Sequence, residues 1–300
     1  MRNFGWVRTF CFGLPLKLIL VVQKIELFDT HKYFPAAADF RRYFKIEADT
    51  PNLDLVVKYL QAFTQLPYEN LTKIIKLNHQ RDNLPYRFPE EILADFEAYH
   101  LGGTCFSLTY YLKTILDYSG FDSYIVMADM PSGANTHCAL ILTLCGEELL
   151  LDPGYLIYRP LKLNGRPGAT YDLTFDTNSQ RYTLWTRQHG KLKKRYAFKK
   201  SPTHLAEFIR YWDASFHWMT MHGICLSRRS ADGYIYLHNH YLKQERATRI
   251  SRGNFDSAIS EIVSRYFQIP PQIVTQAETA LWQNLEFDKE RGLFIPSRRK

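Results

Sequence analysis

In the first third of the chain, apolar positions recur about every three to four residues, which is typical of helices with one buried face. Start signals at residues 50–52 and 89–91 precede two such helices. A third helix is expected to begin at Cys105 and to end at a Gly120 C-cap. Its apolar face carries Leu108, Leu112, Ile115 and Leu116. We therefore expect residues 26–120 to form a small helical bundle.

From Phe121 onward the pattern changes to alternation with a period of two, which is typical of strands. The clearest unit is a hairpin, whose strands cover residues 137–144 and 148–152 on either side of a turn at residues 145–147. Further strands are expected at residues 123–128, 171–175, 182–186 and 196–198. The alternation predicts an antiparallel sheet that forms a β-barrel over residues 121–203.

The last third of the chain mixes the two periods. Helices are expected at residues 201–212, 257–267 and 272–284, and strands at residues 224–227 and 234–239 flank a turn at residues 231–233. The fold class is therefore α+β: an N-terminal helical bundle, a central antiparallel β-barrel and an α/β part over residues 204–300.

The N-terminus combines features of several kinds of segment. Residues 10–22 are mostly apolar and follow Arg2 and Arg8, as in a signal peptide, but Lys17 interrupts the apolar run and no small-residue cleavage site follows. The run is also too short to cross a bilayer. We expect residues 1–25 to be a dispensable, disordered extension, and a weak membrane anchor is the alternative.

Composition limits the classes of partner. The net charge of +8 permits an acidic ligand such as a nucleotide or coenzyme A. Basic residues cluster at 191–200 and 298–300, but no zinc-finger spacing or RNA-binding signature accompanies them, so both are expected to be solvated surface. We expect neither a nucleic-acid nor a membrane partner. Five cysteines without a CxxC pair argue against a disulfide framework and favour the reducing cytoplasm.

The strongest candidate for chemistry is Cys105. It follows Gly102 and Gly103 and stands at the start of a predicted helix. There the unpaired N–H groups and the helix dipole favour an anion, so the thiol should lose its proton more readily than usual. A thiol in this position is a candidate nucleophile, and the same N–H groups are candidates for stabilising an oxyanion.

A thiol nucleophile needs a base, and the base needs a partner that fixes its tautomer. If the hairpin turn has two residues, Leu144 pairs with Glu147, and His137 and Asp152 become diagonal neighbours on one face of the hairpin. We expect Cys105 to take an acyl group, His137 to act as base, and Asp152 to orient the imidazole. Cys138 lies on the opposite strand face and is interpreted as a core residue.

Other histidines offer a weaker hypothesis. His238 and His240 are two positions apart in a predicted strand and would share a face, where His217 or His222 could join them. No acidic or thiol ligand completes the set, so no metal site is expected.

Five motifs, in order, resemble those of arylamine N-acetyltransferases. They cover about residues 26–285 and read Leu66-Pro67-Tyr68-Glu69-Asn70-Leu71, Leu101-Gly102-Gly103-Thr104-Cys105-Phe106, Thr136-His137, Leu151-Asp152-Pro153-Gly154-Tyr155 and Ala214-Ser215-Phe216. The resemblance implies a helical bundle, a β-barrel and an α/β lid. It also implies a ping-pong reaction, in which acetyl-CoA acetylates the cysteine and an arylamine, arylhydroxylamine or hydrazine then takes the acetyl group.

Within the motifs, the resemblance implies substrate contacts for Thr136, Tyr155 and Phe106, and coenzyme contacts for the loop at residues 131–135. The chain departs from the family pattern at Leu101, where the family has Arg, and at Ser107, where it has Glu. Pro153 is a third and milder departure. The first two bring into question how the nucleophile loop is held and which acceptor fits.

Three other functions stay open at this point. The first is an amide synthase acting on a natural-product acyl chain, and the second is a transglutaminase-like cysteine hydrolase, which has the same Cys-His-Asp order. The third, from a different class, is a binding protein on a degraded enzyme fold.

Overall fold

The computed structural model describes residues 24–47, 50–80, 85–188, 191–230, 233–246 and 249–293. Predictions for residues 1–23, for the turn at residues 231–232 and for the basic tail at residues 298–300 therefore lie outside the described residues. The first described residue, Lys24, pairs with Asp213, which lies in the last third of the chain.

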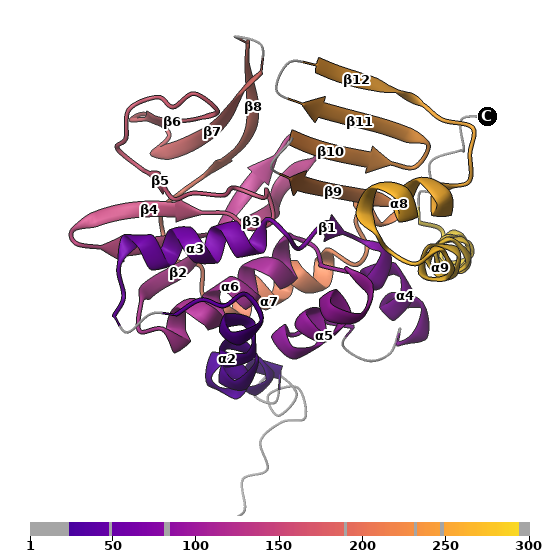
Figure 1. Cartoon of the computed structure of the whole chain (residues 1–300), viewed down its shortest axis with the longest axis horizontal. Coiled ribbons are helices and arrows are strands. Elements are labelled where there is room, and N and C mark those ends of the chain that lie inside the picture. The colour runs from indigo at the N-terminus through magenta and orange to yellow at the C-terminus, as the bar shows by residue number, and fades with distance from the viewer. Residues whose placement is uncertain are drawn as a thin grey trace, which may run out of the picture.

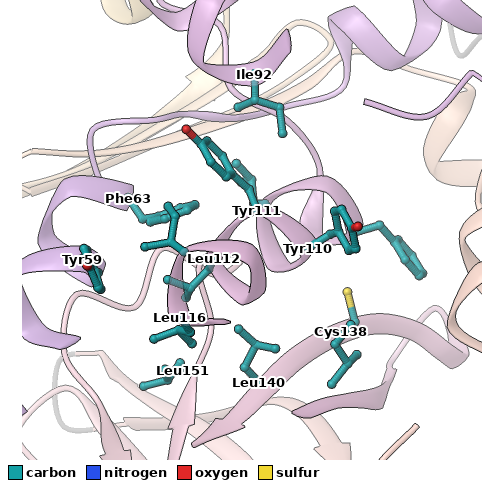
Figure 2. Packing of buried hydrophobic residues seen from close by; sticks show 14 of the residues in the cluster. Tyr59, Phe63, Ile92, Tyr110, Tyr111, Leu112, Leu116, Cys138, Leu140 and Leu151 are labelled. Atoms are coloured by element: carbon teal, nitrogen blue, oxygen red, sulfur yellow. The ribbon is translucent and has the colours of Figure 1, made fainter. Parts of the chain in front are cut away.

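The N-terminal third is helical, as predicted (Figure 1). Its helices are η1 (Thr30–Tyr33), α2 (Phe34–Tyr43), α3 (Leu53–Phe63), α4 (Leu71–His79), α5 (Pro89–Tyr99) and α6 (Cys105–Tyr118). Asn52 caps α3 by accepting a hydrogen bond from the Leu55 N–H at 2.9 Å. Helix α6 is the centre of this part, because most of its residues are buried. Figure 2 shows its Tyr111 and Leu112 among Phe63 of α3, Ile92 of α5 and, on the other side, Leu140 and Leu151 of the sheet that follows.

That sheet has seven strands in the order β5-β4-β3-β2-β8-β7-β6, and all its pairings are antiparallel. The strands are β2 (Asp122–Met130), β3 (Gly133–Leu144), β4 (Glu147–Leu151), β5 (Leu161–Lys162), β6 (Tyr171–Asp176), β7 (Arg181–Gln188) and β8 (Lys191–Phe198). Its edge strands β5 and β6 contact each other, so the sheet is nearly closed. This confirms the predicted barrel. Its interior is a separate apolar cluster that includes Val126, Ile141, Leu184 and Phe198.

The C-terminal third contains a second antiparallel sheet, in the order β1-β9-β10-β11-β12. Its strands are β1 (Tyr68–Glu69), β9 (Cys225–Ser230), β10 (Gly233–His238), β11 (Tyr241–Arg246) and β12 (Arg249–Asn254). The helices of this third are α7 (Leu205–Ala214), η2 (Met219–Met221), α8 (Ile259–Phe267) and α9 (Pro271–Glu290). Because β1 comes from the helical first third of the chain and pairs with β9, this sheet connects the first third to the last third.

Two sequence-based expectations are wrong in detail, and two strands were not predicted. Helix α7 begins at Leu205 and not at residue 201, because Thr203 is held against the barrel: its N–H donates to the Ile125 carbonyl at 2.8 Å. His238 and His240 do not share a strand face, since β10 ends at His238 and the chain turns through residues 239–240 before His238 pairs with Tyr241. The mainly polar strands β11 and β12 were not predicted, because their alternation is weak.

Candidate active site

The nucleophile loop lies between the helical part and the second sheet. The Gly103 N–H donates to the Pro67 carbonyl at 3.3 Å, and the Gly103 carbonyl accepts from the Glu69 N–H at 3.0 Å. Gly102 approaches Pro67 so closely that a Cβ there would lie 1.9 Å from the Pro67 carbonyl oxygen. This loop places Cys105 at the first residue of α6, where Thr104 makes no side-chain capping bond. The predicted position of the thiol at a helix N-terminus is confirmed.

The hairpin register agrees with the prediction. Leu144 pairs with Glu147 across a two-residue turn, and Leu140 pairs with Leu151. As a result, His137 Nε2 and Asp152 Oδ2 are 2.8 Å apart, although fifteen positions separate them in the sequence. Both side chains are almost fully buried. The register of the hairpin therefore brings His137 and Asp152 into a buried hydrogen bond.

Asp152 accepts hydrogen bonds from three sides. Besides His137, the Tyr196 hydroxyl donates to Oδ2 at 2.6 Å, and the Tyr155 backbone N–H donates to Oδ1 at 2.8 Å. Burial, followed by the neighbouring Asp152 charge, raises the pKa of Tyr196 well above its usual range, so this hydroxyl keeps its proton and acts as a donor. Sequence reasoning predicted the strand that contains Tyr196 but gave no sign of this contact.

Cys105 lies close to the His137 ring, since a Cβ on Gly154 would contact both residues. Because Nε2 is engaged with Asp152, Nδ1 is the ring nitrogen left for the thiol, which hydrogen-bonds His137. Burial opposes a charge on His137, but the Asp152 charge and hydrogen bond outweigh it and raise the pKa of the imidazole to about 10. Hydrogen bonds from Cys138 first, and then from His137, lower the pKa of Cys105 well below the usual thiol range. The geometry thus favours a thiolate–imidazolium pair.

Gly154 allows this close approach. A Cβ at residue 154 would lie 2.7 Å from the Cys105 Cβ and 3.3 Å from the His137 Cε1. The backbone that follows Asp152 therefore packs directly against Cys105, and a side chain at residue 154 would push Cys105 away from His137.

Cys138 has a second role besides the predicted one. It is fully buried in the apolar cluster around α6, which agrees with its interpretation as a core residue (Figure 2). On that side of β3 it also hydrogen-bonds Cys105, while Thr109 Oγ1 of α6 donates to the Cys138 carbonyl at 3.3 Å. Burial raises the pKa of Cys138 well above the usual range, so this thiol stays protonated and donates to Cys105.

The two departures from the family motif have a structural explanation. Leu101 is buried among the apolar side chains of α4, α8 and α9, and a different cation supports the loop. Arg87, only 4% exposed, donates through Nη2 to the Gly102 carbonyl at 3.0 Å and through Nη1 to Asp95 Oδ2 at 2.6 Å. Burial raises the pKa of the Glu69 carboxyl, and the Arg87 charge opposes part of that rise. Sequence reasoning missed Arg87, because the residue belongs to no recognised motif.

Ser107 keeps the turn of α6 compact. Its hydroxyl donates to the Thr104 carbonyl at 3.1 Å. A Cβ on Gly103 would lie only 2.4 Å from this hydroxyl oxygen. The small side chain therefore fits against the glycine pair, and no charge is left unpaired by the absence of a glutamate.

The three expected substrate contacts lie in different surroundings. The Tyr155 ring stands edge-on to His137, with ring centroids 5.8 Å apart, and Thr136 is half-buried beside His137. Phe106 is only 1% exposed and packs among Phe208 and Trp212. All three substrate contacts stay predictions.

Within the described part of the chain, no three histidine, cysteine or acidic side chains are placed to hold a metal ion. None of the described helices has the length and apolar character needed to cross a membrane.

Comparison with known proteins places this geometry in a family. A family model described as N-acetyltransferase matches residues 52–273, which is most of the chain and includes Cys105, His137 and Asp152. The chain belongs to the N-acetyltransferase family. The membership confirms the resemblance on which the sequence analysis relied, and it confirms that the protein is an acetyltransferase.

Solved structures share the N-acetyltransferase fold. The arylamine N-acetyltransferase from Salmonella typhimurium has 16% identity and a TM-score of 0.66, over 82% of this chain and 98% of its own. The Mycobacterium marinum enzyme, solved in complex with CoA, has 18% identity and a TM-score of 0.66, over 81% and 97%. A Bacillus cereus enzyme, described as having a unique Cys-His-Glu catalytic triad, has 19% identity and a TM-score of 0.60, over 78% and 98%. No curated protein sequence matches the chain.

Proposed function

We propose that this N-acetyltransferase moves an acetyl group from acetyl-CoA, through a thioester on Cys105, to the nitrogen of an arylamine, arylhydroxylamine or hydrazine. The proposal is supported by three buried residues: His137 hydrogen-bonds Asp152 at 2.8 Å, and Cys105 lies near enough to His137 to be among the influences on its pKa. Acetyl-CoA is the co-substrate, and the reaction requires no further cofactor.

In the first half-reaction the Cys105 thiolate attacks the thioester carbonyl of acetyl-CoA. A bond forms between Cys105 Sγ and the carbonyl carbon, and the bond to the coenzyme sulfur breaks. The His137 imidazolium supplies the proton that the leaving thiolate takes. The attack forms a tetrahedral intermediate with an oxyanion. The unpaired backbone N–H groups at the start of α6 are the donors that stabilise this oxyanion.

In the second half-reaction the amine nitrogen attacks the acetyl-cysteine. Neutral His137 accepts the proton that the nitrogen loses, and Cys105 leaves as a thiolate, which restores the ion pair. Asp152 stays charged throughout and stabilises the imidazolium, because Tyr196 and the Tyr155 N–H hold its carboxylate in place.

The surroundings of Tyr155 suit an acyl donor that carries phosphates. Arg195 of β8 lies 5.9 Å from the centroid of the Tyr155 ring, and the charges of Arg195 and Lys243 are near enough to Lys193 to lower the pKa of its amine. These cations come from the barrel and from the second sheet, which stand side by side in Figure 1. Lys243 is paired with Glu245, so Arg195 and Lys193 supply the positive charge on this side of Tyr155 that favours a polyanionic co-substrate such as CoA.

A direct test compares the wild type with Cys105→Ser. Incubated with acetyl-CoA and an arylamine, the wild type should release CoA and acetylated amine in equal amounts, and the variant should release neither. Transfer by Cys105→Ser at the wild-type rate would contradict the proposal. Release of CoA without acetylated amine would favour the hydrolase, and turnover only with a longer acyl chain would favour the amide synthase.

A cytoplasmic location is part of the same proposal. It is supported by the described cysteines, all of which are free thiols, as a reducing compartment would keep them.

A further inference from the structure

Arg229 of β9 is a half-buried cation that the mechanism above does not use. Its Nε donates to the Leu156 carbonyl at 3.1 Å, and its Nη2 donates to the Tyr171 hydroxyl at 2.8 Å. The guanidinium also lies 5.3 Å from the centroid of the Tyr158 ring and 5.8 Å from that of Tyr234. Two hydrogen bonds and two aromatic rings therefore fix this side chain of the second sheet against the barrel.

Leu156 is the residue in this contact whose backbone is strained. Its φ of 53° lies in the left-handed region, which residues other than glycine rarely adopt. Leu156 is only 1% exposed, so its carbonyl needs a hydrogen-bond donor from the protein, and Arg229 supplies it. A strained backbone conformation persists where the surrounding structure fixes it. The bond from Arg229 is such a constraint.

The strained residue belongs to the turn that follows β4 and begins at Asp152. The Ile157 N–H donates to the Asp152 carbonyl at 3.0 Å, and the Tyr155 N–H donates to Asp152 Oδ1 at 2.8 Å. Leu156 lies between these two donors in the sequence. Because the turn is compact, a shift of the Leu156 carbonyl displaces both donors and, through them, the Asp152 carboxylate.

The same turn contacts His137 and Cys105. Asp152 Oδ2 lies 2.8 Å from His137 Nε2, and a Cβ on Gly154 would lie 2.7 Å from the Cys105 Cβ. Against burial, the Asp152 charge raises the pKa of His137 to about 10. Hydrogen bonds from Cys138 and then from His137 lower the pKa of Cys105. The position of the turn therefore affects the nucleophile by contact and by charge.

We propose that Arg229 is a positioning residue, by which the second sheet holds the turn at residues 152–157 in place against His137 and Cys105. Arg229 acts through the Leu156 carbonyl. The inference rests on the proposed roles of Cys105, His137 and Asp152, but it concerns their alignment and not the transfer of an acetyl group.

Alkylation of Cys105 tests the proposal without any acyl donor. The rate at which the full chain reacts with iodoacetamide, followed on the Cys105 peptide by mass spectrometry, reports the thiolate fraction at each pH. In Arg229→Met the turn loses its support, so the alkylation midpoint should rise by about one pH unit and alkylation below the midpoint should slow roughly tenfold. Arg229→Lys keeps a charged donor and should return the midpoint toward the wild-type value. An Arg229→Met midpoint equal to that of the wild type would overturn the proposal.

Arg228→Met is the matched control for charge. Arg228 precedes Arg229 on β9, and its side chain lies on the opposite face of the strand. There it donates to the Tyr266 carbonyl and to Gln268 Oε1, both at 3.4 Å, so the alkylation profile of Arg228→Met should not move. Equal shifts in Arg228→Met and Arg229→Met would overturn the proposal, because the loss of one positive charge would then explain both.

Tyr171→Phe separates the two hydrogen bonds of Arg229. This variant removes the acceptor on β6 and leaves the bond to the Leu156 carbonyl intact, so the alkylation midpoint should stay at the wild-type value. A shift as large as that of Arg229→Met would contradict the proposal, since the effect would then come from the barrel and not from the turn.

A measurement on the wild type covers the case in which Arg229→Met does not fold. If the second sheet holds the turn, the Tyr155 and Ile157 amides should exchange hydrogen in the same opening that releases the amides pairing β9 with β10. Turn amides that stay protected after the β9 and β10 amides have exchanged would also overturn the proposal. Because neither measurement involves acetyl transfer, either can fail while the proposed function stands.

Discussion

Replacing Gly154 with alanine tests how closely the barrel must approach the nucleophile. The added Cβ would lie 2.7 Å from the Cys105 Cβ and 2.8 Å from its Cα. Carbon atoms in contact settle at about 3.5–4.0 Å, so Cys105 and the residue 152–154 loop must separate by about 1 Å. A misplacement of this size in a reacting group costs on the order of a hundredfold in rate.

The rate to measure is that of acetyl-enzyme formation after mixing with acetyl-CoA, followed by quenching and intact mass analysis. We expect Gly154→Ala to form the acetyl-enzyme on the order of a hundredfold more slowly than the wild type. Gly253→Ala is the matched control, because a Cβ at that glycine meets nothing within 4 Å. A folded Gly154→Ala protein that acetylates at the wild-type rate would refute the reasoning, since Cys105 would then tolerate a displacement from His137.

Three further predictions concern groups around the same site. Arg87→Met leaves Asp95 without its buried partner and frees the Gly102 carbonyl, so the free energy of unfolding in urea should fall by about 3–5 kcal/mol, and an unchanged value would contradict the role of Arg87. Tyr196→Phe removes one hydrogen bond to Asp152, so kcat/KM should fall roughly tenfold while the unfolding midpoint changes little; an unchanged kcat/KM would show that the remaining bonds suffice. The pKa of His137 is raised in the folded enzyme to about 10, so the proton on its imidazole is retained below that pH and lost above it. Acetyl-enzyme formation should therefore decline as the pH rises through about 10, and a decline near the usual histidine pKa would contradict the ion pair.

The register of the β3–β4 hairpin could be predicted because parity alone decides which side chains share a face. Cys145 and Gly146 form a two-residue turn, and this fixes His137 and Asp152 on one face of the hairpin. Likewise, the glycine pair and the apolar spacing after Cys105 were sufficient to place the thiol at a helix start. Both predictions depend on local rules of chain geometry.

The supporting residues could not be predicted, because their partners are far away in sequence or lack a pattern. Arg87 reaches Gly102 only because α5 turns back against the nucleophile loop. Lys73 and Ser215 are brought together although 142 positions separate them, and Tyr196 meets Asp152 only when the barrel is nearly closed. Each of these contacts is a product of tertiary packing, on which periodicity carries no information.

Strands β11 and β12 were missed for another reason. Residues 241–246 and 249–254 contain several charged and polar side chains, and the outer strand β12 is largely exposed. Without a buried face the period-two pattern fades. Pairing of β11 with β10, and of β12 with β11, defines these strands rather than hydrophobicity.

The proposed function requires Cys105 to carry the acetyl group between two substrates. The most direct measurement is the intact mass of the protein after brief exposure to acetyl-CoA without an acceptor, followed by addition of an arylamine. We predict a gain of one acetyl group, located on the Cys105 peptide, that disappears when the amine is added and reappears on the amine. An acetyl group found on another residue, or one that the amine does not remove, would contradict the account.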